Sequence, residues 1–219
     1  MDFSLLETIA LYAVPVVFAI TLHEAAHGYV ARMFGDQTAW MLGRVTLNPL
    51  KHIDPVGTVL VPGALLLMAK LLGGPAFLFG WAKPVPVNFG NLRNPKRDMF
   101  WVAGAGPFAN FVMAIAWALL FKDALPGGVV ASDGLSEMAK AGIEINLMLL
   151  ALNLLPILPL DGGRIAVSLL PHRLALSYAR LEPYGFMVII LLLATGVLNR
   201  LMDPIIRVAI YLVGQLVGL

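Results

Sequence analysis

The sequence predicts an all-α, polytopic membrane protein with five to six transmembrane helices and one short membrane-dipping hairpin or loop. Of its 219 residues, 59% are apolar and 13% are charged, whereas a soluble domain carries about 25% charged residues. So much apolar surface cannot be buried in one soluble core of this size, and lipid must therefore solvate much of it. The apolar residues also fall in long runs. We expect one domain over residues 1–219.

Five apolar runs have about the length of 20 residues that a membrane helix needs. They are Leu5–Phe34, Phe100–Phe121, Gly142–Leu160, Pro183–Leu198 and Pro204–Leu219. A sixth run, Val56–Leu72, precedes a stretch rich in glycine, proline and aromatic residues, which favours extended or looped chain. Within that stretch, Phe77–Asn88 predicts a hairpin with a free edge, to which a substrate strand could add through main-chain hydrogen bonds.

The distribution of lysine and arginine predicts the orientation in the membrane. If the N-terminus lies outside and residues 56–90 dip in and return, eleven of the fifteen cationic side chains are cytoplasmic. Cytoplasmic loops of membrane proteins carry such an excess. The four on the outside are Lys122, Lys140, Arg200 and Arg207. This topology makes the runs Leu5–Phe34 and Gly142–Leu160 parallel and predicts a multi-pass protein of the cell membrane.

The first run carries a metal-binding pattern, His23-Glu24-Ala-Ala-His27, which fits H-E-x-x-H. Residues four apart share one face of a helix, so both imidazoles can bind one ion. Glu24 follows the first histidine directly, where it can reach a metal-bound water whose pKa zinc lowers to about 7. The alternative is a structural polar cluster, but an unpaired ionisable side chain at membrane depth costs about 2.5–3.5 kcal/mol, and such a cluster rarely has this spacing.

A catalytic zinc needs a third protein ligand and an open position. The chain has no cysteine, so the ligand must be His, Asp or Glu. The best candidate is Asp161, which we expect to end an apolar helix before two glycines that permit a sharp exit. Pro156 and Pro159 must disturb this helix, and the freed carbonyls are tolerated where backbone lines a wet cavity or is buried in protein. The alternative is an interfacial Asp-Gly-Gly turn.

Together, HEAAH at residues 23–27 and NLLPILPLDGG at residues 153–163 resemble the site-2 protease family, intramembrane zinc metalloproteases of peptidase family M50. The stretches NPLKHIDPVG (48–57) and GAGPFAN (104–110) are similar to the compact branch of that family, which lacks PDZ and CBS domains. The resemblance covers about two-thirds of the chain. It implies a three-helix catalytic core within residues 5–163, followed by C-terminal helices at about 183–219.

The resemblance also implies a site and an activity. One Zn²⁺ per chain would be held by His23, His27 and Asp161, with Glu24 as the catalytic acid/base and Asn153 near the substrate backbone. The reaction would be hydrolysis of peptide bonds in transmembrane protein substrates, with the active site toward the cytoplasmic side. The lipid bilayer is the other expected partner. Nucleic acid is not expected, because the net charge is only +2 and no basic stripe is present. The oligomeric state stays open.

Other interpretations fit parts of the pattern. A transporter also places ionisable residues in the membrane, although it more often has two matched halves with broken helices. A membrane-anchored zincin with a soluble catalytic domain and a non-catalytic metal-binding scaffold are further alternatives. Asn153 could simply hydrogen-bond to an adjacent helix. His52 and Asp54 could form a second-shell relay, a second metal site, or an ordinary turn near the membrane surface.

Overall fold

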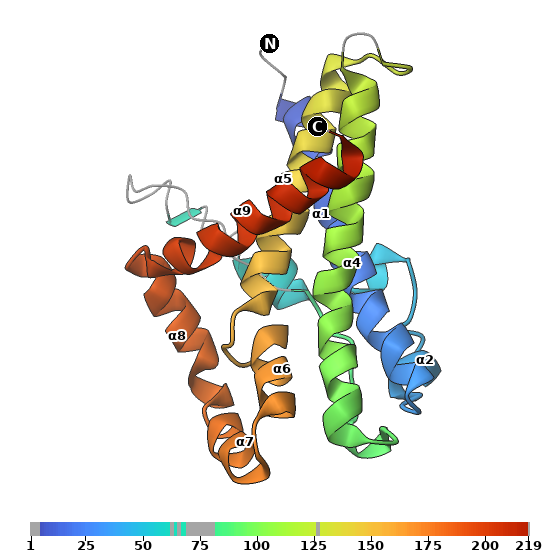
Figure 1. The fold of residues 1–219 in the computed structure, drawn as a ribbon. Coiled ribbons are helices and arrows are strands. Elements are labelled where there is room, and N and C mark those ends of the chain that lie inside the picture. The colour runs from blue at the N-terminus through green and yellow to red at the C-terminus, as the bar shows by residue number, and fades with distance from the viewer. Residues whose placement is uncertain (1–4, 62–63, 65–66, 69–81, 126–127, 219) are drawn as a thin grey trace.

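Three long helices form the centre of the molecule (Figure 1). The computed structural model describes residues 5–61, 64, 67–68, 82–125 and 128–218. The central helices are α1 (Leu5–Met33), α4 (Pro95–Ala124) and α5 (Asp133–Leu154). Helices α1 and α5 run in the same direction and α4 runs in the opposite one (Figure 1). All regular structure in the described residues is helical, which confirms the all-α class.

Helix α4 can lie against both α1 and α5 because its buried positions are mostly small. The buried residues from its centre to its end are Ala103, Gly106, Pro107, Asn110, Ala114, Ala118 and Ala124. Small side chains allow helix backbones to approach closely. Accordingly, α4 has its most extensive contacts with α5 and α1, and α1 also contacts α5 directly. The helices that contain HEAAH and GAGPFAN and the helix that leads to LPLDGG thus pack together, as expected.

The expectation that Asp161 ends an apolar helix is wrong. Helix α5 ends at Leu154, and Asp161 is the first residue of a separate helix, α6 (Asp161–Leu169). Pro156 explains the early end, because proline lacks an N–H and disfavours helical backbone in the residue before it. Gly162 and Gly163 were expected to permit a sharp exit of the chain from a helix, but they have another role. A Cβ on Gly162 would lie 2.3 Å from the carbonyl oxygen of Leu155, so glycine lets α6 lie against the end of α5.

The C-terminal part contains α7 (His172–Ala179), α8 (Glu182–Ala194) and α9 (Val197–Val217). The apolar runs place the last break between helices at residues 199–203. In the structure this break falls at Gly196. Gly196 has φ 71°, a left-handed conformation that glycine adopts without strain and that commonly ends a helix. Helix α9 crosses α5 and α4 (Figure 1). Its contact with them is a buried cluster of apolar residues, namely Ala114, Ala118, Leu147, Leu150, Ala209, Val213 and Val217.

Short helical turns join α1 to α4. They are α2 (Thr38–Met41), η1 (Pro49–Lys51), η2 (Pro55–Leu60) and η3 (Phe89–Asn91). The apolar run Val56–Leu72 is described only in part, and the predicted Phe77–Phe79 arm of the hairpin lies outside the described residues. Residues 82–88 form neither a helix nor a strand ladder with any other described segment. The hairpin therefore stays a prediction.

The described helices differ in how well they would suit a membrane. By length and apolar composition, α4 alone among the searched residues could cross one by itself. Helices α7 and α8 meet the same criterion only as a pair, and the chain bends by 65° between them. The expected number of five to six crossing helices therefore stays a prediction.

Candidate metal centre

The three predicted ligands converge at the centre of the α1, α4 and α6 packing. The Nε2 atoms of His23 and His27 lie 3.1 Å apart. Oδ2 of Asp161 lies 3.2 Å from Nε2 of His23 and 3.3 Å from Nε2 of His27. Each residue is only 8% exposed. Among the searched side chains, these three form the one group of His, Asp and Glu residues close enough to hold a metal ion.

Two elements bring these side chains together. His23 and His27 are one turn apart on α1, and their rings meet edge to face with centroids 4.7 Å apart. Asp161 comes from the first turn of α6, which packs on α4 and follows the end of α5. A carboxylate in the first turn of a helix interacts favourably with the helix dipole. The turn at residues 155–160 thus places the acidic start of α6 beside the histidines.

Hydrogen bonds at the other ring nitrogens fix the tautomers of both histidines. Nδ1 of His27 lies 2.7 Å from the carbonyl oxygen of Val102, which can only accept. Nδ1 of His23 lies 2.6 Å from Oδ1 of Asn110. A neutral imidazole that donates from Nδ1 carries a lone pair on Nε2. Both Nε2 lone pairs are therefore available to the shared space that Asp161 faces.

This donor set fits a zinc ion. Two Nε2 lone pairs and a carboxylate oxygen repel one another at 3.1–3.3 Å unless a cation lies among them. Oδ2 of Asp161 is buried and has no hydrogen-bond donor. Zinc binds His nitrogen at about 2.0–2.1 Å and carboxylate oxygen at about 2.0–2.2 Å, so tetrahedral ligands lie about 3.3 Å apart. The separations in this structure have that size, and three protein ligands leave the fourth position open.

Gly106 leaves room for the imidazole rings of His23 and His27, because it has no side chain. A Cβ at this position of α4 would lie 2.4 Å from Nε2 of His27 and 2.6 Å from Nε2 of His23. Gly104 and Asn110 belong to the same GAGPFAN stretch of α4, and small residues in such a stretch can allow close helix packing. Gly106 does so, but a Cβ on Gly104 would meet open space. Asn110 instead accepts the hydrogen bond of His23, a role that no sequence pattern indicated.

Glu24 lies beside the three ligand residues but is not one of them. Its Oε2 accepts a hydrogen bond of 2.6 Å from the backbone N–H of Val85, which is buried. Glu24 itself is partly buried. The segment of residues 82–91, which contains Val85, therefore crosses Glu24 and fixes one of its carboxylate oxygens. Val85 is 61 residues from Glu24 in sequence.

Two basic residues of the α1–α4 connection hold the first half of this segment. Nη2 of Arg44 donates to the carbonyl oxygens of Lys83 at 2.7 Å and Pro84 at 3.4 Å. The N–H of Lys83 donates to the carbonyl oxygen of His52 at 2.9 Å. His52 is 2% exposed, and its Nε2 lies 3.0 Å from the carbonyl oxygen of Thr46. His52 thus stabilises the loop.

Asp36 holds the second half of the segment of residues 82–91. Its fully buried carboxylate accepts hydrogen bonds from the N–H of Asn88 at 2.6 Å, the N–H of Thr38 at 3.0 Å and the amide of Asn91 at 3.3 Å. Burial alone would raise the pKa of Asp36, but these hydrogen bonds and that of the Thr38 hydroxyl outweigh it, and the pKa lies below its ordinary value. Asp36 therefore ties residues 88–91 to the end of α1.

These contacts limit where a substrate strand could add. The N–H groups of Lys83, Val85 and Asn88 already donate to protein oxygens. Pro84 and Pro86 have no N–H. Residues 82–88 consequently offer few donors to a new strand. Strand addition stays a prediction, and residues 77–81 of the predicted hairpin lie outside the described part.

Other predicted residues make hydrogen bonds to backbone groups outside the three ligand residues. Asn153 is in the last turn of α5, where its amide donates to the carbonyl oxygen of Leu149 at 3.1 Å, so a contact with substrate stays a prediction. Asp54 begins η2 and accepts from the N–H groups of Val56 and Gly57 at 2.9 and 2.7 Å. Neither Asp54 nor His52 belongs to a metal-binding group among the searched residues.

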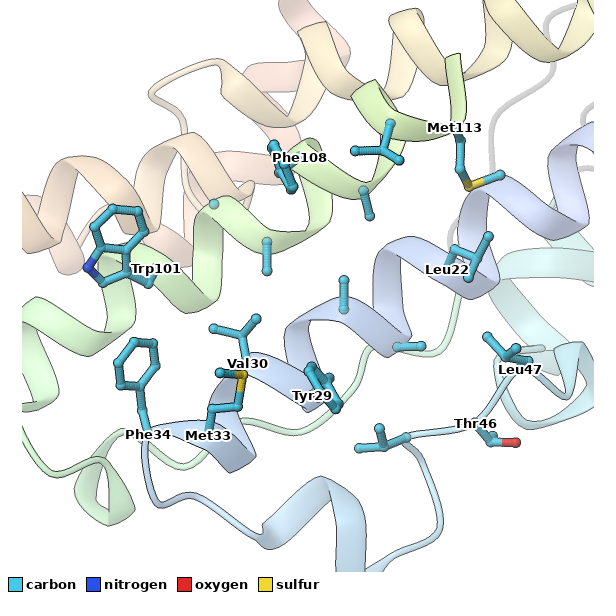
Figure 2. A pocket seen from close by; sticks show the side chains of 17 residues that line it. Leu22, Tyr29, Val30, Met33, Phe34, Thr46, Leu47, Trp101, Phe108 and Met113 are labelled. Carbon is cyan, nitrogen blue, oxygen red and sulfur yellow. The ribbon is translucent and has the colours of Figure 1, made fainter. Parts of the chain in front are cut away.

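An apolar groove of about 970 Å³ lies on another face of α1 and α4 (Figure 2). Leu22 and Tyr29 of α1 and Phe108 and Met113 of α4 line it, together with smaller side chains (Figure 2). None of the three ligand residues lines the groove. The two helices therefore present the ligands on one side and a lipophilic surface on another.

Comparison with known families agrees with this arrangement. The model of the family described as peptidase family M50 matches residues 11–127 and 121–195. The chain belongs to peptidase family M50. The matched ranges include the HEAAH motif, Asn110 and Asp161. The family is one of metalloproteases, and the resemblance to site-2 proteases that the sequence motifs indicated is confirmed.

Relatives within the family match most of the chain. A Bacillus subtilis protein described as "Putative zinc metalloprotease YwhC" is 37% identical over 198 residues, which cover 89% of this chain and 84% of that protein. Rip2 of Mycolicibacterium smegmatis is 34% identical over 84% of this chain and 66% of its own length. Rip2 of Mycobacterium tuberculosis H37Rv is 28% identical, and the chain spans 54% of it. No solved structure matches the chain.

Proposed function

We propose that this chain is an intramembrane zinc metalloprotease that hydrolyses peptide bonds of transmembrane proteins. Membership of peptidase family M50 supports a metalloprotease. The observation that carries the proposal is the convergence of His23, His27 and Asp161, whose ligand atoms lie within 3.3 Å of one another next to Glu24. The relatives YwhC and Rip2, both named zinc metalloproteases, support zinc as the metal.

The three ligand residues would hold one zinc ion through both Nε2 atoms and Oδ2. Bound there, zinc supplies a Lewis acid that polarises the scissile carbonyl and makes a water molecule acidic at neutral pH. The burial of the ligands supports this assignment, because a low local dielectric strengthens charge interactions within the site. Gly106 keeps α4 close to the ligands while leaving the Nε2 atoms unobstructed.

Glu24 acts as the general base and then as the general acid. It takes a proton from the attacking water, whose oxygen bonds to the carbonyl carbon. The peptide C–N bond then breaks, and Glu24 delivers the proton to the leaving amine nitrogen. The hydrogen bond from Val85 supports this role, because it binds Oε2 and orients the carboxylate. Asn153, in the last turn of α5, contacts the substrate backbone and assists at the oxyanion.

The surface of the described helices supports a position within the bilayer. Large apolar side chains are exposed on several helices, for example Phe18 on α1, Phe108 on α4, and Met187 and Leu191 on α8. Soluble monomers rarely expose apolar patches of more than a few hundred square ångströms. Acyl chains can fill the groove between α1 and α4 (Figure 2). The excess of cationic residues favours a cytoplasmic position for the active site.

The decisive experiment compares wild type with Glu24→Gln and Asp161→Ala in detergent micelles. Each protein is assayed for bound zinc and for cleavage of a model transmembrane peptide. Wild type should bind one zinc ion per chain and cleave the peptide. Glu24→Gln should keep zinc and lose hydrolysis, because the ligands remain and the proton acceptor is gone. Asp161→Ala should bind zinc more weakly, because a third ligand is removed.

Glu137→Gln is the matched control. Glu137 is exposed on α5 and pairs with Lys140, so its change should affect neither zinc nor cleavage. Cleavage by Glu24→Gln at the wild-type rate would refute the catalytic assignment. Zinc bound without any cleavage by wild type, together with zinc flux in proteoliposomes, would favour a transporter instead.

A further inference from the structure

We infer that Asn110 and Asn146 form a hydrogen-bonded relay that holds His23 ready for metal binding, and that Asn146 is a positioning residue of the site. The inference rests on the proposed function, since it concerns the same ligands. It adds a residue that belongs to neither the HEAAH nor the LPLDGG motif. Asn146 lies on α5, two turns before Asn153, so the relay joins α1, α4 and α5 at their centre.

The relay is continuous and completely buried. Nδ1 of His23 lies 2.6 Å from Oδ1 of Asn110. Nδ2 of Asn110 donates to Oδ1 of Asn146 at 2.9 Å and, more weakly, to the carbonyl oxygen of Ala19 at 3.4 Å. Nδ2 of Asn146 donates to the carbonyl oxygen of Gly142 at 2.8 Å. Both asparagines are 0% exposed, so bulk water cannot replace any of these bonds.

The backbone sets the direction of the whole relay. The carbonyl oxygen of Gly142 can only accept, so the amide nitrogen of Asn146 must face it and Oδ1 of Asn146 must face Asn110. Asn110 then has to turn its own nitrogen toward Asn146 and the carbonyl oxygen of Ala19. Only an oxygen remains for His23, which must donate from Nδ1. Its Nε2 consequently keeps the lone pair that faces Asp161.

The two metal-binding histidines thus depend on different partners. His27 donates directly to the carbonyl oxygen of Val102, a group that no side-chain substitution removes. His23 is linked to a backbone acceptor through Asn110 by the long contact with Ala19, and through Asn110 and Asn146 by the shorter bond to Gly142. If Asn146 is lost, Asn110 keeps only the longer contact with Ala19, and its amide can turn over. A turned amide would present N–H to Nδ1 and favour the wrong tautomer of His23.

The test measures zinc affinity by competition with a chromogenic chelator, using the full chain in detergent micelles. Asn146→Leu should bind zinc about 10- to 100-fold more weakly than wild type, the usual effect of losing an outer-shell partner. Asn146→Asp should stay close to wild type, because burial keeps its carboxyl group protonated, so that one oxygen accepts from Asn110 and the O–H donates to the carbonyl oxygen of Gly142. Asn199→Leu, the same change at an exposed position of α9, is the matched control and should not alter zinc affinity.

The comparison of leucine with aspartate separates positioning from mere packing. Equal zinc affinity in wild type and Asn146→Leu would overturn the relay and leave the proposed function standing. Equal losses in the leucine and aspartate variants would also overturn it, because then an oxygen that accepts from Asn110 does not preserve zinc affinity. If Asn146→Leu does not fold, Asn146→Ala takes its place in the comparison with aspartate. A wild-type chain that binds no zinc would refute the proposed function itself.

Discussion

Single atoms decide whether the ligand residues can approach one another. The site has no spare volume on its α4 side, where the position of a Cβ on Gly106 falls 2.4 Å from Nε2 of His27. Two residues earlier, at Gly104, a Cβ would meet nothing within 4 Å. The same substitution at these two glycines of one helix therefore distinguishes a requirement of the metal site from a general property of the helix.

Gly106→Ala should weaken zinc binding by tenfold or more. Adding a methyl group to a filled site costs about 1–3 kcal/mol, and each 1.4 kcal/mol corresponds to a factor of ten in affinity. Gly104→Ala should leave zinc affinity unchanged and stabilise α4 slightly, because alanine is favoured over glycine in a helix interior by about 0.8–1.0 kcal/mol. Chelator competition and thermal unfolding measure the two effects. Wild-type zinc affinity in Gly106→Ala would contradict the tight fit.

The sequence predicted residues of the site only where their spacing along the chain, or a motif, indicates that they meet. His23 and His27 are four apart on one helix, and their convergence follows from helix geometry alone. The approach of Asp161 was expected from its motif, and its Oδ2 lies 3.2 and 3.3 Å from the Nε2 atoms of the two histidines. The hydrogen bonds of Asn110 and Asn146 could not be foreseen, because they depend on how three helices rotate against one another. The bond from Val85 to Glu24 depends likewise on a long loop.

At the scale of elements, residues 82–91 connect the site to the stability of the α1–α4 connection. Arg44 and His52 hold the beginning of this segment, Glu24 holds its middle, and Asp36 holds its end. Burial would raise the pKa of Asp36, but hydrogen bonds from Thr38, Asn88 and Asn91 outweigh it and lower the pKa. Protonation of Asp36 in strong acid should therefore loosen the end of the segment.

Asp36→Asn should destabilise the protein at pH 7 and have less effect in acid. The lowered pKa of Asp36 means that its stabilisation is complete above its ordinary pKa of 3.8 and is lost as pH falls through the folded-state pKa. Hydrogen bonds to a charged group contribute about 1.5–3 kcal/mol each. Thermal unfolding in micelles at several pH values measures the difference. A gap between wild type and variant that stays constant below pH 4 would contradict this expectation, and Asp203→Asn serves as the exposed control.

The sequence predicted which helices form better than it predicted where they begin and end. The run Gly142–Leu160 is apolar throughout, so hydropathy alone joins what the structure divides into α5 and the turn before α6. Pro156 marks the break, although proline also occurs inside α1, α4 and α9. The presence of a proline alone therefore does not determine where a helix ends. At the other break, Gly196 was a weak signal because isolated glycines also lie within α4.

At the scale of the whole molecule, the direction of the helices determines where the site lies. The ligands of α1 lie in its second half, and Asp161 follows the end of α5, so parallel α1 and α5 bring both motifs to the same level (Figure 1). Helix α4 returns the chain in the opposite direction. The described part of the α4–α5 loop and helix α2 therefore lie toward opposite ends of the molecule (Figure 1). If α4 crosses a bilayer, these two segments must lie on opposite sides of it.

Cysteine labelling tests this orientation directly, because the chain has no cysteine of its own. Val129→Cys and Met41→Cys each place one thiol at a highly exposed position, 91% and 72% exposed in the present side chains. In intact bacterial cells, a membrane-impermeant maleimide should label Val129→Cys, because the positive-inside rule places the α4–α5 loop outside. Met41→Cys should react only after the cells are opened. Labelling of Met41→Cys alone would reverse the orientation, and labelling of both in intact cells would contradict a crossing by α4.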